Sequence, residues 1–119
     1  MAPPPNGYHL LSAEEAQDLL LNGKGSVRVE VAPGRPVAIF AHRGEFFAID
    51  AACPHQGAGL EDGDIEDSSD GPCVACPRHG WSITLRTGFC EDIDDIGVGT
   101  YKVQRLEDGR ICVATKSGT

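Results

Sequence analysis

The stretch that decides the fold begins with Cys53-Pro-His55-Gln-Gly57 and ends with Cys76-Pro-Arg-His79-Gly80-Trp81. Each half supplies one thiolate and one imidazole, and each places proline and glycine beside these candidate ligands. Proline fixes φ and removes an amide donor, while glycine allows sharp turns and close approach of neighbouring backbone. The stretch therefore predicts two tight loops that present four metal ligands, which are Cys53, His55, Cys76 and His79.

Two cysteines and two histidines suit two kinds of metal centre. Zinc binds such a set tetrahedrally, and the spacing Cys73-Val-Ala-Cys76 allows a site made of Cys53, Cys73, Cys76 and His79. A cluster of two irons takes two thiolates on one iron and two imidazoles on the other. The zinc set leaves His55 and the symmetry of the two halves unexplained, so the residues favour the iron–sulfur cluster.

Together the two halves resemble the paired motif of the Rieske family, C-x-H and C-x-x-H, with twenty residues between His55 and Cys76. Segments 63–67, 72–74 and 83–88 are similar to the small soluble Rieske-domain proteins of eukaryotes. The resemblance implies a [2Fe–2S] cluster, with Cys53 and Cys76 on a buried iron and His55 and His79 on an exposed one. It also implies a mostly β fold, an antiparallel sandwich with a small cluster-binding subdomain and one short helix.

The chain departs from the high-potential respiratory Rieske proteins near the predicted cluster. Ala58 and Arg78 stand where those proteins carry two further cysteines joined as a disulfide. Trp81 and Ile83 stand where they place serine and tyrosine hydroxyls. Fewer hydrogen bonds to the sulfurs disfavour the reduced, more negative cluster, so we expect a potential towards the low end of roughly −150 to +300 mV. We also expect the potential to fall with pH once a ligand histidine titrates.

The pattern of apolar residues predicts a β protein with one domain over the 119 residues 1–119 and cluster-binding loops at about 51–83. The spacing of Ser12 and Glu15 is that of a capping box and predicts a short helix over about 13–21. The acidic run 61–70 predicts a polar loop, and Asp108-Gly109 predicts a hairpin. Alternating or β-branched runs predict strands at 8–11, 27–31, 37–41, 46–49, 72–76, 81–85, 101–106 and 110–113.

The formal net charge is −8, from 18 acidic and 10 basic residues. The acids gather within 61–70 and again within 91–95, and the first of these segments contains no Lys or Arg. Such a chain should repel nucleic acid, so its expected partners are redox proteins, a reductase and an electron acceptor, with basic docking faces.

Residues 1–7 lack a signal or anchor pattern, and no apolar run reaches the length of a membrane span. We expect no membrane insertion and a cytoplasmic or other intracellular soluble compartment.

Taken with the resemblance, these features predict an electron carrier that is not an enzyme by itself and that passes one electron from a reductase to an oxygenase or other redox enzyme. The alternatives are a small Rieske subunit of a larger reductase, such as a nitrite reductase, and an interaction module stabilised by a zinc ion.

Five cysteines without an export signal argue against a disulfide framework. Cys73, Cys90 and Cys112 are expected to pack as small apolar residues, and His9 and His42 to be surface or hydrogen-bonded histidines.

Overall fold

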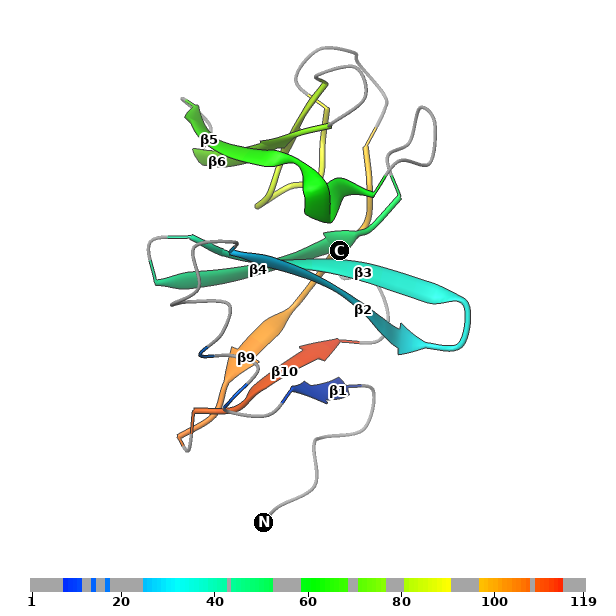
Figure 1. Ribbon diagram of the computed structural model, residues 1–119, viewed down its shortest axis with the longest axis vertical. Helices are drawn as coiled ribbons and strands as arrows, with labels where there is room; N and C mark the ends of the chain where they lie inside the picture. Colours follow the sequence, from blue (N-terminus) through cyan, green and yellow to red (C-terminus); the bar gives the residue numbers. More distant parts are fainter. Residues whose placement is uncertain are drawn as a thin grey trace.

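The computed structural model describes residues 8–11, 14, 17, 25–42, 44–52, 59–68, 71–76, 81–90, 97–107 and 109–114. Within these ranges the strands form three antiparallel sheets stacked in layers (Figure 1). The elements in chain order are β1 (Tyr8–Leu11), β2 (Ser26–Ala32), β3 (Arg35–His42), β4 (Glu45–Asp50), the 3-10 turn η1 (Leu60–Asp62), β5 (Asp64–Ser68), β6 (Gly71–Ala75), β7 (Ser82–Thr84), β8 (Thr100–Tyr101), β9 (Val103–Arg105) and β10 (Ile111–Ala114).

A four-stranded sheet in the order β2-β3-β4-β8 forms the middle layer (Figure 1). A lower sheet, β1-β10-β9, and an upper sheet, β5-β6-β7, cover its two faces. The lower core, around Ile39 and Ile111, lies between the middle and lower sheets, and the upper core, around Phe40 and Ile83, lies between the middle and upper sheets. Residues 37–40 of β3 are buried without interruption, because successive side chains of a strand enter the two cores in turn.

The prediction of a mostly β, layered antiparallel fold is confirmed. The strands expected at 8–11, 27–31, 37–41, 46–49, 72–76, 81–85 and 110–113 are observed as β1, β2, β3, β4, β6, β7 and β10, with small shifts at their ends. The helix expected over 13–21 lies largely outside the described residues. Its two described positions, Glu14 and Gln17, are helical and exposed.

The expectation of a polar loop over 61–70 is wrong for the described part of that segment. Leu60–Asp62 forms η1, and Asp64–Ser68 forms β5, an edge strand paired antiparallel with β6. Ile65 packs against the upper core, while Asp64 and Glu66 point to solvent. Backbone pairing with β6 and one apolar contact stabilise this strand, although its exposed acids give it the composition of a loop.

The strand expected over 101–106 is divided at Lys102. β8 pairs with β4, with Tyr101 opposite Ala48, and β9 pairs with β10, with Val103 opposite Val113. The switch between sheets takes one residue, and the Ala114 N–H donates to the Lys102 carbonyl at 2.9 Å. One continuous segment, 100–105, therefore belongs to both the middle and the lower sheets.

The hairpin predicted at 108–109 is confirmed for its described part. β9 and β10 pair antiparallel, and the Leu106 N–H donates to the Arg110 carbonyl at 2.8 Å. Gly109 has φ +93°, a conformation that favours glycine because it has no Cβ.

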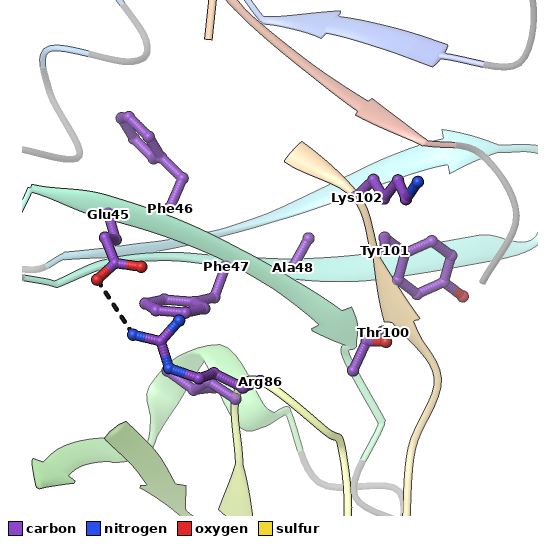
Figure 2. Close-up of a pocket in the computed structure, with 9 residues that line it drawn as sticks. Glu45, Phe46, Phe47, Ala48, Arg86, Thr100, Tyr101 and Lys102 are labelled. Carbon is purple, nitrogen blue, oxygen red and sulfur yellow. Dashed lines mark hydrogen bonds and ion pairs between the residues drawn. The ribbon is translucent and has the colours of Figure 1, made fainter. Parts of the chain in front are cut away.

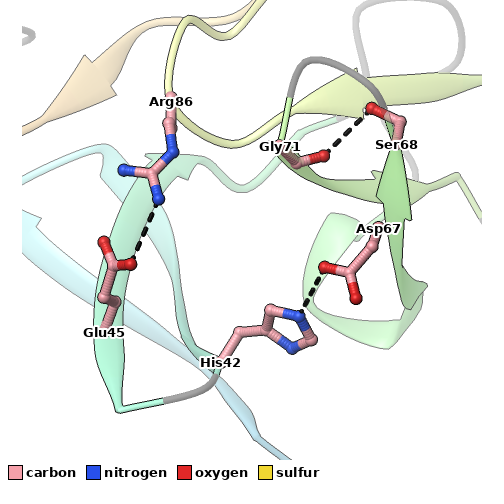
Figure 3. Close-up of polar contacts among 6 residues, drawn as sticks. All are labelled: His42, Glu45, Asp67, Ser68, Gly71 and Arg86. Atoms are coloured by element: carbon pink, nitrogen blue, oxygen red, sulfur yellow. Dashed lines mark hydrogen bonds and ion pairs between the residues drawn. The ribbon is translucent and has the colours of Figure 1, made fainter.

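Two polar contacts join β5 and the turn after β7 to the end of the β3–β4 hairpin (Figure 3). His42 Nε2 lies 3.0 Å from Asp67 Oδ1, and Arg86 Nη2 donates to Glu45 Oε1 at 3.1 Å. His42 and Glu45 face each other in the register of the hairpin, so both contacts act at one place. Exposed ion pairs contribute about 0–1 kcal/mol each. The apolar upper core is therefore the main attachment between these layers.

An open pocket of about 430 Å³ lies beside β4 where the segment 100–105 departs from it (Figure 2). Tyr101 and Lys102 line it on one side, and Arg86 lines it from the upper layer. The Arg86 guanidinium carbon lies 5.2 Å from the centroid of the Phe47 ring, which adds a cation–π contact to the ion pair with Glu45. The pocket lies at the start and middle of β4, away from its C-terminal end.

Candidate metal centre

The first predicted ligand loop follows the C-terminal end of β4. Ala52 forms an antiparallel bridge with Gly59, and the Leu60 N–H donates to the Ala51 carbonyl at 2.7 Å. These contacts close the segment 53–58 at its base. Cys53 and His55 lie inside that segment and outside the described residues.

The second predicted ligand loop follows β6. The Cys76 N–H donates to the Trp81 carbonyl at 2.8 Å, which closes the segment 77–80 at its base. Cys76 is 2% exposed, and the four described cysteines form no disulfide with one another. His79 lies outside the described residues. Of the four predicted ligands, Cys76 is thus the one whose surroundings are described.

The fold brings the bases of both loops to one place. Ala51 and Leu60, from the first loop, and Cys76, from the second, all belong to the upper core. Gly63 lies directly against the end of β6, since a Cβ at Gly63 would come 2.1 Å from the Ala75 carbonyl oxygen. The two loops therefore start from neighbouring positions on one core, as a shared metal centre requires.

The donors suit a two-iron cluster better than a zinc site that uses Cys73. Cys73 lies inside β6, buried, and faces Glu66 and Thr84 in the two neighbouring strands. Val74 and Cys76 share the upper core, and alternate residues of a strand point to opposite faces, so Cys73 points away from Cys76. Without Cys73, the predicted ligands that remain are one cysteine and one histidine on each closed loop, which is the set that a Rieske-type cluster takes.

The other sequence expectations for cysteine and histidine agree with the described surroundings. Cys73, Cys90 and Cys112 are buried in or beside strands, as predicted. His42 contacts Asp67, and His9 is partly exposed on β1. Among the described residues, no three His, Cys, Asp or Glu side chains are placed to hold a metal ion.

Sequence reasoning missed Asp50, which fixes the end of β4 three residues before Cys53. The Asp50 N–H donates to the Gly99 carbonyl at 3.0 Å, and the Gly99 N–H donates back to Asp50 Oδ2 at 2.8 Å. The Tyr101 hydroxyl donates to Asp50 Oδ1. These bonds join residues about fifty positions apart, so no local pattern in the sequence indicates them.

Burial raises the pKa of Tyr101 above its ordinary value of 10.0, and the hydrogen bond to Asp50 and the negative charge of Asp50 raise it further. Arg35 acts in the opposite direction. The folded state thus favours the neutral phenol. The associated stability is fully present below pH 10, the pKa of an unfolded tyrosine, and is lost as pH rises through the raised pKa.

Replacing Tyr101 with phenylalanine is expected to lower the free energy of unfolding at pH 7 by about 1.5–3 kcal/mol, because a hydrogen bond to a charged group is lost. Above pH 10 the wild-type protein should lose stability more steeply than the variant, which has no phenol to ionise at this position. Urea unfolding between pH 7 and pH 11 measures both effects. If the free energy of unfolding falls equally steeply with pH in the two proteins above pH 10, the role of Tyr101 would be contradicted.

These observations define a class of protein: a layered antiparallel β fold with two loops closed at their bases, each with one cysteine and one histidine predicted to bind metal. A family described as soluble Rieske-type ferredoxin matches residues 22–114. The chain belongs to this family, and the predicted resemblance is confirmed. Within the described ranges, no helix has the length and apolar character needed to cross a membrane.

Similar proteins include both eukaryotic and bacterial members. The human Rieske domain-containing protein is 52% identical over 54 residues, which cover 45% of this chain and 34% of the human protein. The 3-phenylpropionate/cinnamic acid dioxygenase ferredoxin subunit of Photorhabdus laumondii is 38% identical over 91 residues, which cover 75% of this chain and 80% of that subunit. The chain thus matches about a third of the length of its human relative.

A solved structure with the same fold comes from Mycobacterium tuberculosis and is described as the small subunit of an NADH-dependent nitrite reductase. Its TM-score is 0.74 at 27% identity, and the match covers 79% of this chain and 85% of that one.

Proposed function

We propose that this protein is an electron carrier that takes up one electron on a Rieske-type [2Fe–2S] cluster and is not an enzyme by itself. The observation that carries the proposal is the pair of loops closed over one core in a chain of the soluble Rieske-type ferredoxin family. Cys53 and Cys76 would hold one iron, and His55 and His79 the other. When bound, such a cluster accepts and returns one electron at a potential set by its ligands and surroundings.

The residues around Cys76 support a potential towards the low end of the Rieske range. Ile83 is fully buried in the upper core, and Trp81 packs against that core from the base of the second loop. Neither side chain carries a hydroxyl that could donate to a cluster sulfur. A cluster with few donors resists the additional negative charge of reduction.

Electron paramagnetic resonance tests the proposal directly. Protein grown with ample iron and purified without oxygen should contain equal amounts of iron and acid-labile sulfide. After reduction with dithionite, its spectrum should show an average g value below that of an all-thiolate cluster, because two imidazoles ligate one iron. A colourless protein that holds zinc would overturn the proposal.

We infer that redox partners with basic faces dock on an acidic edge made of Asp62, Asp64 and Glu66. These exposed side chains belong to η1 and β5, which follow the first ligand loop in the chain. An interface between electron-transfer proteins is small, about 1,200 Å² or less, and its association is steered by charge. The dioxygenase ferredoxin relatives support an electron acceptor of the oxygenase type.

If partners dock on this acidic edge, removing its negative charges should slow electron transfer from the chain to a basic acceptor. Cytochrome c, a basic haem protein, serves as the acceptor for the chemically reduced chain. Replacing Asp64 and Glu66 together with asparagine and glutamine should lower the rate about three- to tenfold at low ionic strength and leave it unchanged at high salt. The control is the double variant Glu14→Gln/Glu107→Gln, which removes the same number of charges at exposed positions outside this edge. If the control slows transfer equally, net charge and not this edge guides association.

A second candidate is a small subunit of a larger reductase, which the likeness to the nitrite reductase small subunit favours. Tight co-purification with a large flavin or haem subunit would support it. A chain that purifies alone and is reduced repeatedly by a separate reductase would support the proposal of an independent electron carrier. The single domain over 1–119 and the cytoplasmic or other intracellular location stay predictions.

A further inference from the structure

Glu61 places a largely buried carboxylate in η1, between the two ligand loops. Its side chain is 16% exposed, and its Oε1 is buried without a hydrogen-bond partner among the described residues. Its Oε2 lies 3.8 Å from Arg28 Nη1, and the Arg28 side chain is 50% exposed. This long ion pair leaves much of the negative charge of Glu61 uncompensated, because the half-exposed guanidinium is partly screened by water.

Two glycines locate this carboxylate relative to the loops. A Cβ at Gly59 would come 2.6 Å from Glu61 Oε2, so the carboxylate lies directly on the residue that closes the first loop. Gly59 is bridged to Ala52, which precedes Cys53 in the sequence, so the carboxylate lies beside the base of the first loop. On its other side, η1 leads to Gly63, which lies against Ala75, the neighbour of Cys76.

The backbone of η1 holds the carboxylate in this position. Ser26 Oγ donates to the Glu61 carbonyl at 2.7 Å, and Leu60 is fully buried in the upper core with Cys76. The backbone that carries Glu61 is therefore anchored next to the bases of both loops. The acids of β5, in contrast, point to solvent, where water and salt screen them.

We propose that Glu61 tunes the reduction potential downward by opposing the negative charge that one-electron reduction adds to the metal centre. This inference rests on the proposed electron-carrier function. Coulomb repulsion between a buried charge and the added electron raises the free energy of the reduced state and leaves the oxidised state less affected. Arg28 partly offsets the effect, so the pair Arg28–Glu61 sets its size.

The test is the midpoint potential of the cluster-loaded chain, measured by spectroelectrochemical titration. Glu61→Gln keeps the shape of the side chain and removes its charge. We expect it to favour the reduced form about three- to tenfold at a fixed electrode potential, where tenfold corresponds to about 59 mV for one electron. Asp62→Asn is the matched control, because Asp62 is the exposed neighbour and loses the same charge. Its shift should be much smaller and should vanish at high salt.

Arg28→Gln keeps the proposal falsifiable if Glu61→Gln fails to bind the cluster. Removing the cation should shift the equilibrium in the opposite direction, towards the oxidised form, while the spectrum of the reduced protein stays unchanged. Equal shifts in Glu61→Gln and Asp62→Asn, or no shift in Arg28→Gln, would overturn the role of Glu61. If the wild-type chain contains no iron, or shows no reversible one-electron reduction, the proposed function itself would be overturned.

Discussion

Replacing Cys76 with serine should yield a chain that retains less than about a tenth of the wild-type iron and loses the visible absorption of the cluster. The serine hydroxyl is not ionised at neutral pH and is a much poorer ligand for iron than a thiolate. Cys76 is 2% exposed and packs with Val74 in the upper core, so the substitution also buries a hydroxyl, which costs about 1–3 kcal/mol. Iron and sulfide analysis, with absorption spectra, measures the result.

Cys73→Ser is the matched control for this experiment. Cys73 is also 2% exposed and lies only three positions earlier, but on the opposite face of β6. This variant should lose a similar amount of stability and keep its cluster. If both serine variants lose a metal that proves to be zinc, the set Cys53, Cys73, Cys76 and His79 would be the correct one.

Replacing Phe40 with alanine is expected to lower the free energy of unfolding by about 3–5 kcal/mol, the usual cost of removing a buried phenyl ring. Phe40 is fully buried in β3 and packs in the upper core with Leu60 and Cys76. The cavity should therefore also loosen the bases of both ligand loops. We expect faster release of iron to a chelator, together with a lower midpoint in urea unfolding.

Phe89→Ala provides the same chemical change at the surface. Phe89 is 64% exposed, so removing its ring should change the free energy of unfolding by no more than about 0.5 kcal/mol. Its release of iron should match that of the wild-type chain. Similar losses in the two variants would mean that the upper core does not hold the loops in place.

The sequence was sufficient to predict the strands whose side chains face a core. Val27, Val29 and Val31 in β2 show the alternation of a half-covered strand, and the continuous apolar run at 37–40 in β3 reflects cores on both faces. The acidic strand β5 gave no such signal. Its place depends on backbone bonds to β6, on the packing of Ile65 against the upper core and on the contact of Asp67 with His42.

The candidate ligands were found because cysteine, histidine, proline and glycine repeat at matched spacings in both loops. Asp50, Tyr101 and Glu61 were not singled out, since each acts through a partner far away in the chain or through its burial. Asp50 belongs to an ordinary strand end, and Glu61 is one acid among six in its segment. Only the folded arrangement distinguishes them from solvated side chains.

The strand switch at Lys102 has a consequence for how the molecule opens. The segment 100–105 forms backbone hydrogen bonds with β4 in the middle sheet and with β10 in the lower sheet. Neither sheet can therefore separate from the other without breaking bonds to this segment. Amide protons in both layers should then become accessible to deuterium together, in one subglobal opening. A bound centre above the middle sheet would in this way be coupled to the lower strands, which it never touches.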